Sequence, residues 1–100
     1  KEIQMQIRKI TITMVKTVEY EDQTFLLMGF SKGNFCIEDL ANIIDSGKLN
    51  PDFIYSSSFL TSPVSCMELL DVFGSRIGIG TEGGEFLLYD FLKREEYLAQ

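Results

Sequence analysis

The chain has 100 residues and 45% of them are hydrophobic, which is enough for one small packed domain. Nine basic and fifteen acidic residues give a net charge of −6, which argues against binding to nucleic acid or to an anionic membrane surface. No apolar run approaches the roughly 20 residues that cross a bilayer, and the N-terminus lacks the apolar core of a signal peptide. We therefore expect no membrane span. The two cysteines in apolar strand-like segments and the lack of an N-glycosylation motif favour an intracellular, cytoplasmic protein.

The first half of the chain begins with strand patterns. Residues 10–15 are rich in β-branched and apolar side chains, which favour a strand. Residues 26–28 and 35–37 each alternate apolar side chains with a period of two, as strands with one buried face do. The stretch between them, residues 31–34, contains a glycine that can adopt the positive φ of a tight turn. The pattern predicts a β-hairpin and a preceding strand joined to it through residues 19–23.

A short helix is expected after this hairpin. Asp39 can cap a short helical insertion near residues 40–47, which would stop at Gly47 and Pro51. Residues 53–59 then predict a fourth strand, which completes the first half of the chain.

The second half of the chain repeats the first. A shift of 51 residues aligns residues 10–40 with residues 61–91 without a gap, and it pairs Gly33 with Gly84. The apolar alternation is kept wherever a strand is expected. The expected strands of this second copy are residues 64–69, 77–79, 86–88 and 93–98. Each copy is therefore predicted to contain four strands.

Residues 33–40 and 84–91 resemble the third strand of a WD-repeat, in which a turn glycine leads through alternating apolar residues to an aromatic and Asp pair. Glu38-Asp39 and Tyr89-Asp90 occupy the position of that pair, and the chain has neither the Trp nor the His of the family's signature. The resemblance implies an all-β fold of antiparallel four-stranded β-propeller blades, WD-like, in two repeats. It divides the chain into blade one at residues 10–59, blade two at residues 60–100, and residues 1–9 as the end of a preceding blade or an N-terminal strand.

The same resemblance implies a non-catalytic scaffold for protein–protein interaction. Members of this family commonly bind partners through the loops between blades and the turns between second and third strands. In this sequence these correspond to the blade connection Leu60, Thr61 and Ser62 and to the turn residues Ser31, Lys32, Glu82 and Gly83. Because each blade buries both faces against neighbours, two blades alone would leave apolar faces and strand edges open. The expected partners are other proteins or further blades of the same propeller.

The residues offer little for catalysis. Residues 78–83 match the G-x-G-x-x-G nucleotide loop, but residues 85–91 predict a strand where a dinucleotide fold begins a helix. The chain lacks His, and Cys36 and Cys66 lie in strand-like segments where core packing is the simpler interpretation. We expect no enzyme activity, cofactor, metal or small-molecule substrate. The alternative, from a different class, is a self-contained α+β regulatory ligand-binding domain whose helix packs on one sheet.

Overall fold

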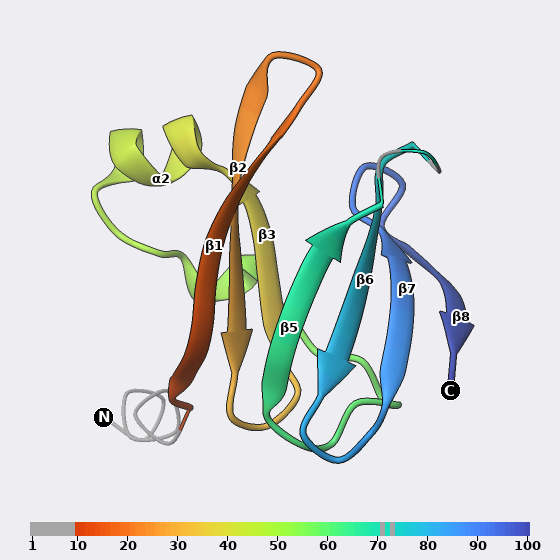
Figure 1. Cartoon of the computed structure of the whole chain (residues 1–100). Helices are drawn as coiled ribbons and strands as arrows, with labels where there is room; N and C mark the ends of the chain where they lie inside the picture. The colour runs from red at the N-terminus through yellow and green to blue at the C-terminus, as the bar shows by residue number, and fades with distance from the viewer. Residues whose placement is uncertain (1–9, 71, 73) are drawn as a thin grey trace.

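The two halves of the chain form two four-stranded antiparallel sheets in a computed structural model that describes residues 10–70, 72 and 74–100 (Figure 1). The first sheet contains β1 (Ile12–Tyr20), β2 (Gln23–Phe30), β3 (Phe35–Asp39) and β4 (Ile54–Tyr55). The second sheet contains β5 (Val64–Leu69), β6 (Arg76–Thr81), β7 (Phe86–Asp90) and β8 (Glu95–Ala99). Strands pair in chain order within each sheet, which confirms an all-β fold built from two four-stranded units. The preceding blade or strand expected at residues 1–9 lies outside the described residues.

The repeat is visible in the strand register, with one correction to the alignment. β3 and β7 are related by a shift of 51 residues, as the sequence predicts. In the first strands, however, Met14 lies opposite Gly29 while Cys66 lies opposite Gly80, a shift of 52 residues. The gapless alignment is therefore wrong in β1 and β5. The connection between the first two strands is one residue shorter in the second copy than the alignment assumed.

Several strand boundaries differ from the prediction; β8, for example, begins at Glu95 and not at residue 93. β1 continues to Tyr20, and a two-residue turn at Glu21 and Asp22, with φ of 50° and 65°, replaces the expected connection of residues 19–23. Hairpins favour such turns because positive φ at both positions matches the twist of the strands. The predicted strand at residues 53–59 is shorter, since only Ile54–Tyr55 pairs with β3. The serine-rich residues that follow form the connection to the second sheet.

The insertion after β3 has the predicted helix boundaries. Helix α2 (Leu40–Ser46) begins at Asp39, whose carboxylate accepts a hydrogen bond of 2.9 Å from the backbone N–H of Ala41. It ends at Gly47, with φ of 73°, and a single 3-10 turn, η1 (Pro51–Phe53), leads into β4. Helix α2 contains no fully buried residue, and it contacts the first sheet at β2 and β3.

The main core lies between the two sheets. The first sheet contributes Phe25, Leu27 and Phe35, and the second contributes Val64, Met67, Ile77, Ile79, Leu87 and Tyr89. The backbones of the two sheets come closest where β5 meets β1 and β2. Burial of these apolar side chains holds the sheets together as a stack.

A smaller core covers part of the far face of the first sheet, the face that points away from the second sheet. There Met28, Phe30 and Cys36 pack against Leu49 and Phe53 of the insertion. Burial raises the pKa of the Cys36 thiol to about 11, with a further contribution from Glu38. The predicted core position is thus confirmed for Cys36.

Cys66 does not share that environment, because it is exposed on β5. The period of two in this strand points Met67 into the core between the sheets and leaves Cys66 and Glu68 on the opposite face. The expectation that Cys66 packs in the core is therefore wrong.

Candidate functional site

The residues predicted to contact partners lie at one end of the stack. The β2–β3 turn, the β6–β7 turn and the connection from β4 to β5 meet at the lower end in Figure 1. We call this region, residues 31–34, 60–63 and 82–85, the turn end. It contains every predicted contact residue.

Leu60 packs the β4–β5 connection against the first sheet. Its side chain is only 3% exposed, and its backbone lies directly over Gly33 in the β2–β3 turn. A Cβ on Gly33 would stand 2.5 Å from the Leu60 carbonyl oxygen, and the φ of Gly33 is +84°. This buried position corrects the expectation that Leu60 itself touches a partner. Leu60 instead fixes the position of the exposed residues beside it.

Glu85 organises the other side of the turn end. Its carboxylate accepts hydrogen bonds from the Thr61 hydroxyl at 2.6 Å and the Thr61 N–H at 3.0 Å. The hydroxyls of Ser62 and Thr81 donate to it at 3.0 and 2.9 Å. These bonds, those from Thr61 foremost, lower the pKa of Glu85 from 4.5 to about 2. Sequence reasoning missed Glu85, because its partners Thr61 and Ser62 lie 24 and 23 residues away along the chain.

Ser62 and Gly83 are brought into direct contact. The Ser62 hydroxyl accepts a hydrogen bond of 3.0 Å from the Gly83 N–H, and a Cβ on Gly83 would stand 2.6 Å from that oxygen. The N–H of the neighbouring Glu82 donates to the Pro63 carbonyl at 2.9 Å. The loop between the sheets and the β6–β7 turn therefore form one hydrogen-bonded surface.

The β2–β3 turn is fixed through Ser31. Its N–H donates to the Thr11 carbonyl at 2.8 Å, and its hydroxyl accepts from the Thr11 N–H at 3.1 Å. The side chain of Lys32 is exposed, as are those of Thr61 and Glu82. The turn end thus presents polar groups and charges of both signs on a backbone held in place, which suits recognition of a protein surface.

The nucleotide-loop motif falls in the β6–β7 hairpin. β6 ends at Thr81, the turn follows, and β7 begins at Phe86 without any helix. Gly84 adopts φ of +83°, as Gly33 does in the matching turn. The strand predicted after the motif is confirmed, and a helix N-terminus that could hold a phosphate does not follow this turn.

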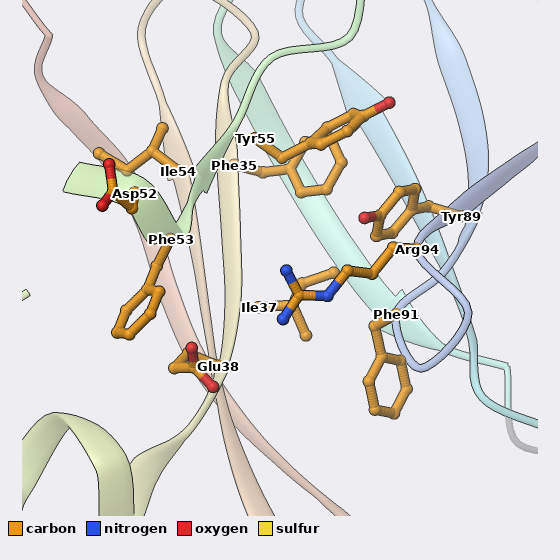
Figure 2. A pocket seen from close by; sticks show the side chains of 10 residues that line it. All are labelled: Phe35, Ile37, Glu38, Asp52, Phe53, Ile54, Tyr55, Tyr89, Phe91 and Arg94. Carbon is orange, nitrogen blue, oxygen red and sulfur yellow. The ribbon is translucent and has the colours of Figure 1, made fainter. Parts of the chain in front are cut away.

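A separate hollow opens between the sheets near β4 and β8 (Figure 2). Its volume is about 100 Å³, and the side chain of Arg94 points into it. Its other lining residues are Phe35, Ile37, Glu38, Asp52, Phe53, Ile54, Tyr55, Tyr89 and Phe91. Ligand pockets usually have volumes of roughly 300 Å³ or more, so this hollow is smaller than a usual ligand pocket.

Tyr55 closes one side of this hollow and links the sheets. Its hydroxyl donates to the Glu96 carboxylate on β8, and its ring packs 5.0 Å from the ring of Tyr89. Burial and the bond to Glu96 raise the pKa of Tyr55 to about 12. The Tyr55 hydroxyl is therefore a structural hydrogen-bond donor at neutral pH.

The described residues include no cluster of three or more side chains able to hold a metal ion. Among the same residues, no helix is both long enough and apolar enough to cross a membrane. Comparison with families of known proteins, with curated proteins and with solved structures finds no match to this chain.

Proposed function

We propose that this chain is a non-catalytic scaffold for protein–protein interaction, formed by two blades of a WD-like β-propeller that belongs to a larger protein or assembly. The observation that supports this proposal is the stacking of two equivalent four-stranded sheets. The connection between them contacts a turn of each sheet, through the packing of Leu60 on Gly33 and through a hydrogen bond from the Gly83 N–H to Ser62.

The turn end is the surface that we assign to partner binding. Lys32, Thr61 and Glu82 are exposed there on turns that are fixed by hydrogen bonds. A rigid polar surface loses little conformational entropy when a partner binds, so its charges can select the partner. Leu60 and Glu85 act as supports of this surface.

Affinity capture with a charge-swapped variant tests the assignment. The chain is immobilised, and the captured proteins are quantified for the natural sequence and for the double variant Lys32→Glu, Glu82→Lys. Because rim charges set partner selection, we expect the specific partners to be depleted at least several-fold by the swap.

A matched control uses the same charges elsewhere. Asp45→Lys with Lys48→Glu exchanges one acidic and one basic side chain at exposed positions of the insertion, away from the turn end (Figure 1). This control should capture the same partners as the natural chain. Equal capture by all three proteins, or no specific capture by any, would refute the proposed function.

A further inference from the structure

We propose that the outer face of the second sheet binds the far face of the first sheet in a second copy of this chain, so that chains associate head to tail. The outer face is the side of β5–β8 that points away from the first sheet, and it carries Cys66, Glu68, Gly80, Phe86 and Leu88. This inference rests on the proposed function, because it assumes the stack of two blades. The partner that it names is a second copy of the chain.

The contact inside the chain is the template. Val64 of the second sheet sits on Gly29 of the first, so closely that a Cβ on Gly29 would lie 2.6 Å from the Val64 Cβ. Met67 is also buried in this interface, and Phe35 of the first sheet is 1% exposed beneath the second. One face of the first sheet thus receives the apolar first strand of the second sheet.

The second sheet presents the same receiving face, and within residues 10–70, 72 and 74–100 no other sheet packs against it. Gly80 is the equivalent of Gly29, but a Cβ there would meet only Cys66 of its own sheet within 4 Å. Phe86, the equivalent of Phe35, is 36% exposed. The outer face of the second sheet therefore has the same glycine and aromatic positions as the face of the first sheet that Val64 packs against.

The first sheet carries the matching inserted face. With the shift of 52 residues, Val64 and Met67 correspond to Ile12 and Val15 on β1. Val64 and Met67 are 0% and 1% exposed, whereas Ile12 and Val15 are 51% and 58% exposed. Exposed apolar residues at the positions that are buried inside the chain indicate a second contact of the same kind.

The polar groups at these positions also match. Within the chain, the ammonium of Lys16 on β1 pairs with the carboxylate of Glu68 on β5 at 2.7 Å. Glu68 is the repeat equivalent of Lys16, so a second copy docked in the same way would place its Lys16 beside the exposed Glu68.

A hydroxyl group that bonds across the two sheets also has an equivalent in the second sheet. The Thr13 hydroxyl donates to the Val64 carbonyl across the sheets at 2.6 Å. Its equivalent in the second sheet, Ser65, is exposed; its hydroxyl donates to the Gly80 carbonyl of its own sheet at 3.3 Å and would turn to make the same bond to a docked chain. The receiving face is thus complementary in shape, charge and hydrogen bonding to a β1 strand.

The insertion leaves room for this contact. It covers the far face over Met28, Phe30 and Cys36 through Leu49 and Phe53. The sheets inside the chain come closest along β1, β2 and β5, and they part toward β4, where the hollow lies. The open part of the far face, along β1, is the part that the contact uses. Such a contact joins two different faces, so repetition produces a closed ring or an open filament.

Complementation between two surface variants tests the proposal. Phe86→Lys places a charge on the receiving face and Val15→Glu places a charge on the inserted face, each at a position exposed in the single chain. Each charge should prevent binding through that face. Sedimentation of the natural chain should show masses above 11.4 kDa that grow with concentration or settle at a closed ring. Each variant alone should stay at 11.4 kDa, and their mixture should form a species of twice that mass and no larger.

Circular dichroism melts confirm that both variants are folded, and Ile44→Lys on helix α2 serves as the control, since Ile44 is 68% exposed and is not one of the residues assigned to either contact face. This control should associate as the natural chain does. A natural chain of 11.4 kDa at every concentration would overturn the proposal, as would association that both variants retain. Either result would leave capture by the turn end unaffected, so the proposed function is judged separately.

Discussion

Val64 of β5 lies against Gly29 of β2, so that hydrogen is the only side chain that fits at position 29. This contact joins β2 of the first sheet to β5 of the second, in the region where the two backbones approach most closely. Its repeat counterpart, Gly80, has only Cys66 of its own sheet beside it. Substitutions at Gly29 and Gly80 therefore distinguish the cost of disturbing the contact between the sheets from the cost of placing a side chain in the strand.

We predict that Gly29→Ala destabilises the chain by about 1–3 kcal/mol, the usual cost of overpacking a core. The Val64 side chain is β-branched and buried, so it has little freedom to move away. Gly80→Ala is the control, and its cost should be clearly smaller because the exposed Cys66 side chain can rotate. Urea unfolding at a concentration where the chain is monomeric measures both. Equal losses would contradict the stacking contact.

Glu85 should make stability depend on pH in a defined window. Its pKa is lowered from 4.5 to about 2 in the folded chain by the bonds from Thr61, Thr81 and Ser62. A lowered folded-state pKa adds stability that is complete above about pH 4.5 and is lost as the pH falls toward 2. Glu85→Gln removes this titration, so its unfolding free energy should change less between pH 5 and about pH 2.

The comparison is made by urea unfolding of both proteins across that range. Glu95→Gln, which neutralises an exposed carboxylate on β8, is the control and should keep the pH dependence of the natural chain. If Glu85→Gln and the natural chain showed the same slope, the carboxylate would not be held by the loop hydroxyls as described.

The equivalent residues Asp39 and Asp90 accept hydrogen bonds from backbone N–H groups just after β3 and β7, but they differ in burial. Asp90 is 4% exposed and accepts a bond of 2.7 Å from the Ser75 hydroxyl, as well as bonds of 3.0 Å from the N–H groups of Leu92 and Lys93. Asp90→Ala leaves these donors unpaired, so we expect a loss of about 2–3 kcal/mol. Asp39→Ala should cost about 1 kcal/mol, as for an exposed helix cap.

Thermal and urea unfolding of the two aspartate variants provide the test. Because both residues follow the same strand of the repeat, the comparison holds the backbone context nearly constant. A larger loss for Asp39→Ala than for Asp90→Ala would show that the buried network around Ser75 contributes little.

Local rules made much of this fold predictable. Gly33 and Gly84 mark hairpin turns because only positive φ closes them, and both adopt it, at 84° and 83°. Asp39 and Gly47 define helix α2 because a side-chain cap and a left-handed residue are strong boundary signals. Signals of this kind lie within a few residues of the structure that they determine.

The rest depended on contacts between distant segments. The turn at Glu21 and Asp22 adopts positive φ without glycine, so no glycine marks its position in the sequence. The exposure of Cys66 follows from the register of β5, which one residue of misalignment reverses. Glu85 gains its role only because the connection between the sheets folds back onto its turn, and periodicity does not predict such a contact.

The stack of the two sheets is the feature on which both proposals depend, and nuclear Overhauser effects measure it most directly. On the monomeric Val15→Glu background, we predict cross-peaks from the Val64 methyl groups to the Hα protons of Gly29 and to the Met14 side chain, because these groups are in contact. Intact signals from each sheet without any cross-peak between them would contradict the stack, and with it the scaffold and the head-to-tail contact.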